Sequence, residues 1–182
     1  MEEYTNMKIR SACAHIPAPC RLAPDEFVLW TDEVFPSDVR ILGEVLCRIL
    51  GEIESQTQRE DLDRVELALD EALANAIVHG NQSDPSKAVR IGVALQKDGS
   101  LLIIVKDVGS GFDVTCIPEP TAGENLLMTH GRGIFLIKQL VDDVRFHFES
   151  GTEICMHFRP PRKVQAIRKG WARSTTVLNN IR

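Results

Sequence analysis

Two turn signals, each set between apolar runs, constrain the fold of this chain most. An Asp-Gly pair at positions 98–99 lies between the apolar runs 89–96 and 101–106, and such a pair predicts a tight hairpin turn. A second turn signal, Ser-Gly at 150–151, separates two further apolar runs. Because a hairpin pairs its two strands antiparallel, we expect a largely antiparallel sheet.

Three other segments have the period of amphipathic helices. Apolar residues recur every three or four positions over about 38–55, 60–78 and 134–144, as the buried stripe of a helix does. The apolar run 27–30 predicts an edge strand ahead of them. Ser37 is the predicted N-cap of the first helix, and Gly80 and Asn81 are predicted stop residues after the second. The resulting order predicts an α+β fold, a two-layer sandwich in which helices cover one face of a mixed, mostly antiparallel sheet.

Composition divides the 182 residues into three parts. Residues 1–25 contain three prolines and no clear period, which predicts a loosely held N-terminal extension. Residues 26–160 hold the predicted strands and helices, enough chain for one domain with its own core. Residues 161–182 form a basic tail without Asp or Glu. We interpret this tail as a solvated terminal helix, with contact to a partner, a nucleic acid or the domain itself as the alternatives.

Several functional classes are excluded by the same composition. The net charge is −5 despite the basic tail, and an acidic body argues against broad nucleic-acid binding. No apolar run reaches the roughly 18 residues of a membrane helix, and the N-terminus lacks the pattern of a secretory signal. Five scattered cysteines without a Cys-x-x-Cys pair fit neither a disulfide framework nor a zinc site. We therefore expect a cytoplasmic protein that contacts no membrane and no nucleic acid directly.

The helix predicted over 60–78 carries a polar pair on an otherwise apolar side. Glu71 and Asn75 lie one turn apart, in an arc that they share with Leu67 and Val78. A buried carboxylate needs a partner or a function, because unpaired burial costs several kcal/mol. Here an amide oxygen can ligate Mg²⁺ while the carboxylate orients or deprotonates a hydroxyl. The competing interpretation is a surface helix with two solvated side chains.

An acid in a glycine turn follows the apolar run 101–106. Asp107 is the next residue, with Gly109 and Gly111 after it. A carboxylate held at the end of a buried strand can accept a hydrogen bond from an exocyclic amine such as that of adenine. The glycines allow the backbone to pass close to a ring and a ribose.

A second glycine segment, Gly131-Arg132-Gly133, begins the helix predicted from 134. The first amides of a helix lack internal partners and attract anions such as phosphates. The pattern is neither a P-loop nor a Rossmann fingerprint. The stretch 113–130 before it has prolines and no strand pattern, which is typical of a functional lid or of disorder.

Taken in order, these segments resemble the GHKL (histidine-kinase-like) superfamily of ATP-binding domains over about residues 27–159. Within that superfamily the chain is most similar to bacterial anti-sigma-factor serine kinases, on the stretches 71–81 and 131–137. The motifs that carry the resemblance are Glu71-x-x-x-Asn75, Asp107-x-Gly109-x-Gly111, Gly131-x-Gly133 and Ser150-Gly151-Thr152.

The resemblance implies a Bergerat-like fold that binds ATP and Mg²⁺. By position, Asn75 would hold the Mg²⁺, Asp107 would select adenine, and residues 113–130 would be the ATP lid. Glu71 would be the catalytic general base acting on a serine hydroxyl. The further ATP-binding residues that the resemblance implies are Gly109, Gly111, Gly131, Arg132, Gly133 and Thr152.

The resemblance also implies a function. The chain would be an ATP-dependent serine-protein kinase and anti-sigma regulatory factor, which phosphorylates an anti-anti-sigma (STAS-type) partner, controls a sigma factor or similar regulator, and tends to form homodimers. A catalytically silent ATP-binding module that switches partners is the alternative, because binding and catalysis share the same motifs. A third hypothesis is a structural or DNA-binding domain, and only the basic tail supports it.

Overall fold

The computed structural model describes residues 27–110, 132–148 and 150–160. The predictions for the N-terminal extension, the lid at 113–130, Gly111, Gly131 and the basic tail lie outside these residues. The described strands are β1 Phe27–Pro36, β2 Ala88–Gln96, β3 Leu101–Lys106, β4 Asp143–His147 and β5 Glu153–Phe158.

These strands form one sheet in the order β1-β2-β3-β5-β4. Both predicted hairpins are present, and β3 is the central strand. The sheet was expected to be mixed, but every neighbouring pair among the described strands is antiparallel. The physical reason is that β5 lies between β3 and β4 and runs opposite to both, so that β3 and β4, which run in the same direction, are not neighbours.

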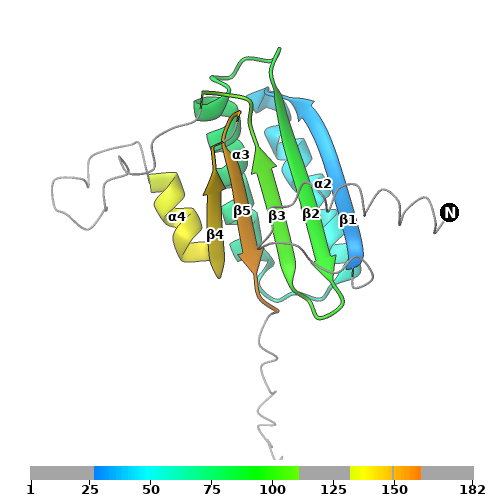
Figure 1. The fold of residues 1–182 in the computed structure, drawn as a ribbon. Coiled ribbons are helices and arrows are strands. Elements are labelled where there is room, and N and C mark those ends of the chain that lie inside the picture. Colours follow the sequence, from blue (N-terminus) through cyan, green and yellow to red (C-terminus); the bar gives the residue numbers. More distant parts are fainter. Residues whose placement is uncertain (1–26, 111–131, 149, 161–182) are drawn as a thin grey trace, which may run out of the picture.

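Helices cover one face of this sheet, which confirms the predicted α+β two-layer sandwich; in Figure 1 the strands lie in front of α2 and α3. The described residues contain a 3₁₀ turn η3, three α-helices and a π-helical segment η4. Their bounds are η3 Val39–Ile41, α2 Leu42–Gln56, α3 Leu62–Ala74, η4 Asn75–Gly80 and α4 Arg132–Leu140.

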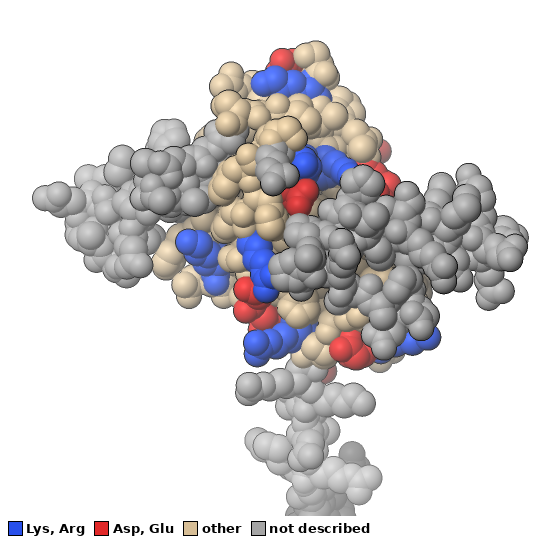
Figure 2. Space-filling view, viewed as in Figure 1, with Lys and Arg blue, Asp and Glu red and all other residues tan. Residues whose placement is uncertain are grey.

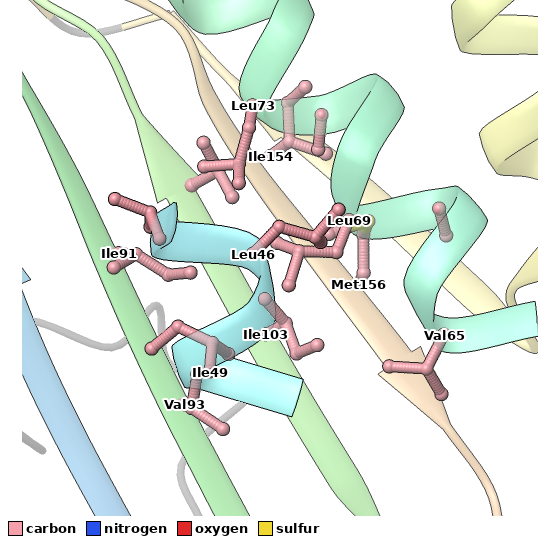
Figure 3. Close-up of a cluster of buried hydrophobic side chains, with 14 of the residues drawn as sticks. Leu46, Ile49, Val65, Leu69, Leu73, Ile91, Val93, Ile103, Ile154 and Met156 are labelled. Carbon is pink, nitrogen blue, oxygen red and sulfur yellow. The ribbon is translucent and has the colours of Figure 1, made fainter. Parts of the chain in front are cut away.

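The core lies between the helices and the sheet because alternate residues of each strand point to one face. Figure 3 shows side chains from α2 and α3 packed against those of β2, β3 and β5. Each fully buried Leu or Ile contributes roughly 1.5–3 kcal/mol, so this layer holds α3 firmly on the sheet. Residues with no exposed surface include Ile49, Val65, Leu69, Leu73, Ile91, Ile103 and Met156.

The start of the first helical region differs from the sequence prediction. Ser37 was expected to be its N-cap, but Asp38 accepts the hydrogen bond from the Arg40 amide (2.9 Å). The Arg40 side chain also donates to this carboxylate and lowers the pKa of Asp38 to about 2. Ser37 is fully buried instead, and its hydroxyl donates to the Ile77 carbonyl (3.4 Å).

Candidate functional site

The predicted helix over 60–78 changes character at Asn75. The α-helical part ends at Ala74, and the following segment has π-helical spacing, in which the Asn81 amide donates to the Ala76 carbonyl five residues earlier (2.9 Å). Such widened turns are frequently found at functional sites. The prediction of one regular helix was wrong in its last turns, because an apolar period cannot reveal where the hydrogen-bond spacing widens.

The side of α3 that carries Glu71 is less buried than the sequence suggested. Leu67 and Val78 are 43% and 40% exposed, so the expectation that they line a second apolar side was wrong. Only part of this side is covered, by α4. Glu71 and Asn75 are both partly exposed as residues, although the Asn75 Nδ2 atom itself is buried.

Gly133 brings the start of α4 against this polar pair. A Cβ atom placed on Gly133 would lie 2.6 Å from Glu71 Oε2 and 3.1 Å from Asn75 Nδ2. No side chain fits there unless the carboxylate and the amide move. Three residues from two separate motifs therefore meet at the first turn of α4, where amides without helical partners favour anions.

Asp107 forms the second part of the site, directly after β3. It is only 2% exposed, and its Oδ1 accepts hydrogen bonds from the amides of Gly109 (2.8 Å) and Thr152 (3.0 Å). The Asp107 amide donates to the Thr152 carbonyl (3.0 Å) in return. Backbone groups thus fix the carboxylate rigidly between the end of β3 and the start of β5.

The end of the π-helical segment packs onto this carboxylate. A Cβ atom on Gly80 would overlap the Asp107 carboxylate, and a Cβ atom on Gly109 would overlap the Gly80 carbonyl. Gly109 is therefore required by contact with protein backbone, a reason that the sequence did not reveal. Since Asn75 begins the segment that Gly80 ends, the six residues of η4 connect the two parts of the site.

Asn81 is a structural residue of the site that the sequence reasoning missed. It is fully buried; its Oδ1 accepts from the Val108 amide (3.1 Å) and its Nδ2 donates to the Ala88 carbonyl (2.9 Å). It thereby joins the π-helical segment to the loop after β3. Gly80 and Asn81 were interpreted only as a helix stop. One feature of the sequence could have indicated this role. Asn81 directly follows the helix with the polar pair, and its amide side chain can both donate and accept hydrogen bonds.

Two of the predicted binding residues carry buried polar atoms without a partner. Among the described residues, Asn75 Nδ2 and Thr152 Oγ1 are inaccessible to water and form no hydrogen bond. Leaving such a group unsatisfied costs about 1–3 kcal/mol, and native proteins contain few of them. Both residues therefore fit contact with a polar ligand, and the Asn75 amide also offers an oxygen of the kind that Mg²⁺ prefers.

The remaining predicted residues are placed only in part. Arg132 begins α4, while Gly111 and Gly131 lie outside the described residues. No helix in the described part of the chain has both the length and the apolar character needed to cross a bilayer.

Known proteins with similar sequences include bacterial regulators. The chain is 30% identical over 103 residues to the serine-protein kinase RsbW of Oceanobacillus iheyensis, covering 53% of this chain and 65% of the relative. It is also 30% identical over 88 residues to the anti-sigma F factor of Priestia megaterium, covering 47% of this chain and 60% of the relative. The chain thus spans less than two thirds of the length of these relatives.

Solved structures and family models agree on the fold. The structure of the RsbU and RsbW domains of Rv1364c from Mycobacterium tuberculosis matches 74% of this chain and 34% of its own, with a TM-score of 0.54 at 18% identity. The model of the histidine kinase-like ATPase domain matches residues 35–158. This match spans the polar pair of α3, Asp107 and the start of α4. The chain therefore belongs to the histidine kinase-like ATPase domain family, as its resemblance to the GHKL superfamily predicted.

Proposed function

We propose that this domain binds ATP where Asp107, Asn75 and Gly133 lie, and that Glu71 serves transfer of the γ-phosphoryl group to a serine of a partner protein. The observation that carries the proposal is the pair of buried atoms without partners, Asn75 Nδ2 and Thr152 Oγ1. Both belong to segments that converge on the Asp107 carboxylate and on Gly133.

Adenine recognition follows from the state of the Asp107 carboxylate. Its Oδ1 already accepts two backbone amides, but an ionised carboxylate has about four acceptor positions. The exocyclic amine of adenine can donate to one of those that remain. Guanine presents a carbonyl oxygen at the same ring position, which a carboxylate repels. The Thr152 hydroxyl, which can both donate and accept, supplies a second polar contact.

Phosphate positioning is assigned to Asn75 and the first turn of α4. When bound, Mg²⁺ neutralises charge on the phosphates, and Asn75 is the residue that would hold it through its amide oxygen. The amides at the start of α4 favour the same anionic groups. Glu71, one helical turn before Asn75, accepts the hydrogen bond of a serine hydroxyl and takes its proton as phosphoryl transfer proceeds.

The relatives' names supply the class of partner. Proteins named serine-protein kinase RsbW and anti-sigma F factor support a kinase that acts on a protein serine and controls a sigma factor or similar regulator. The resemblance to anti-sigma-factor serine kinases adds an anti-anti-sigma (STAS-type) substrate, a cytoplasmic location and a homodimer to the proposal. In this proposal residues 26–160 are the kinase domain, which the extension 1–25 precedes and the basic tail 161–182 follows.

A catalytically silent partner-switching module is the second candidate, and one observation favours it. No hydrogen bond or ion pair joins the Glu71 carboxylate to any other described residue, whereas a general base is usually oriented by a neighbour. In this alternative ATP changes the affinity for a partner without being consumed.

The test combines binding with transfer. Calorimetric titration with ATP and Mg²⁺ should show one site, a clear preference for ATP over GTP, and a loss of affinity in Asn75→Ala. Incubation with γ-labelled ATP and a STAS-type protein encoded nearby should then label a serine of that protein. ATP binding without any labelling would leave only the silent module, and absence of ATP binding would overturn both candidates.

A further inference from the structure

The second face of the sheet, opposite the helices, carries charged side chains of both signs (Figure 2). Three ion pairs lie on this face. Arg90 with Asp32 and Lys106 with Glu153 each join neighbouring strands, and Arg145 with Asp143 lies within β4. One group at the β4–β5 hairpin is different, because it combines three types of metal-ligating side chain.

This group consists of His147, Glu153 and Cys155, and the register of the hairpin brings it together. His147 on β4 pairs directly with Glu153 on β5, and Cys155 lies two residues further along β5, which puts it on the same face as Glu153. The intervening Ile154 belongs to the core under the helices. The three side chains therefore share the outer face and are remote from that core.

The ligand atoms of this group are close to the spacing of a metal site. The imidazole, carboxylate and thiol atoms all lie within 4.8 Å of one another, and Cys155 Sγ is 3.8 Å from Glu153 Oε1. Zinc bonds of about 2.0–2.3 Å in a tetrahedron put neighbouring ligand atoms about 3.3–3.8 Å apart. Small rotations of the side chains are enough to reach that geometry.

His147 provides an independent indication. Its Nε2 is buried and has no hydrogen-bond partner among the described residues, so a nitrogen that could bind a cation is held out of water. Cys155 is 2% exposed and the Glu153 side chain is 15% exposed. The second carboxylate oxygen of Glu153 pairs with Lys106 (3.6 Å), while the first faces the sulfur.

We propose that His147, Glu153 and Cys155 bind a zinc-type divalent cation on the outer face of the sheet. A thiolate and an imidazole select such a metal over Mg²⁺ or Ca²⁺, so this site is distinct from Asn75. Three protein ligands leave a fourth position for water or for a group of a partner. The absence of a Cys-x-x-Cys pair did not exclude zinc, since strand register supplies the proximity that sequence spacing lacks.

The site adjoins the proposed nucleotide site through one peptide bond. Glu153 directly follows Thr152, whose amide holds Asp107. A cation that fixes the β4–β5 hairpin would therefore also steady the start of β5, on which that carboxylate depends. This steadying effect rests on the proposed function, whereas the metal site itself does not.

The experiment uses the full chain, stripped of metal by a chelator and titrated with Co²⁺ in place of Zn²⁺. One equivalent should produce the sulfur-to-cobalt charge-transfer band, which Zn²⁺ then abolishes. Cys155→Ala should lose the band, and His147→Gln should weaken Co²⁺ binding at least about tenfold, since loss of a residue that only orients a ligand already costs about 10–100-fold. Cys47→Ala, which removes an exposed thiol on α2, and His157→Gln are matched controls and should bind as the unmodified chain does.

Each outcome of the Co²⁺ titration either supports or overturns the metal site. A chain without the band, or a band that persists in Cys155→Ala, overturns the proposal. If Cys155→Ala does not fold, as judged by circular dichroism, the partly exposed positions His147 and Glu153 decide it through His147→Gln and Glu153→Gln. Because the titration contains no nucleotide, its failure would leave ATP binding untouched, and failure of ATP binding would leave the metal site untouched.

Discussion

The two parts of the candidate site are built in different ways. Around Asp107, backbone amides hold the carboxylate and glycine backbone packs onto it. Around Glu71 and Asn75, side chains project from α3 toward Gly133, and no hydrogen bond joins them to other described residues. The first part is thus held by the protein backbone before a ligand arrives, which lowers the cost of ordering on binding, and among its buried, described side-chain atoms only Thr152 Oγ1 lacks a partner. The second part lacks such backbone support, so in the proposed function its side chains obtain their polar partners from the ligand.

Glu71→Gln is expected to have the largest effect, on the second part alone. The amide keeps the shape of the side chain but cannot take a proton, so the transfer rate should fall about 10²–10⁴-fold, as loss of a general base does. ATP affinity should stay within about threefold, because the first part is unchanged. Single-turnover transfer and calorimetry measure the two quantities.

Glu66→Gln, an exposed change on the same helix, is the control and should alter neither quantity. If Glu71→Gln keeps the full transfer rate, the residue is not the base, and the two parts of the site would both serve binding only.

Asp107→Asn is expected to act on the first part. An amide oxygen can still accept the Gly109 and Thr152 amides, so the free energy of unfolding should fall by only about 1 kcal/mol. The charged acceptor for adenine is lost, and ATP affinity should fall about 10–100-fold. Calorimetry and urea unfolding test this, with the exposed Asp63→Asn on α3 as the control. Equal ATP and GTP affinity in the unmodified chain would contradict the role given to Asp107.

Gly80→Ala is expected to break the connection between the two parts. The new methyl group would overlap the Asp107 carboxylate, and overpacking of this kind costs about 1–3 kcal/mol. Gly51→Ala is the matched control, since no atom lies within 4 Å of a Cβ atom there and the change removes a glycine from the interior of α2. That control should gain up to about 1 kcal/mol. Urea unfolding of both variants provides the comparison, and equal stabilities would mean that the contact at Gly80 relaxes freely.

The fold was largely predictable because its signals are local. Both hairpins and all three α-helices follow from turn residues and apolar periods. The first strand was predicted only over 27–30, because Asp32 and Glu33 interrupt its apolar run. Both carboxylates have partners from other elements, Arg90 and Arg48, so the strand continues to Pro36. Such pairing over long sequence distances is invisible in a local pattern.

The sequence predicted which residues belong to the candidate site, but it did not predict the contacts between them. Motifs identified Glu71, Asn75 and Asp107, but the approach of Gly133 to the first two depends on how α4 packs onto α3. The bridging role of Asn81 and the cluster around His147 likewise arise from backbone register. These features need three-dimensional neighbours, which composition and spacing do not specify.

The π-helical segment has a consequence for how this domain can change. Its six residues act as a spacer that holds Asn75 against Gly133 of α4 while Gly80 contacts the Asp107 carboxylate. Deletion of one residue would restore α-helical spacing and turn one end by about 100° relative to the other. Chain length is thus constrained here as strictly as residue identity. The β2–β3 turn, remote from both contacts, is where insertions should accumulate instead.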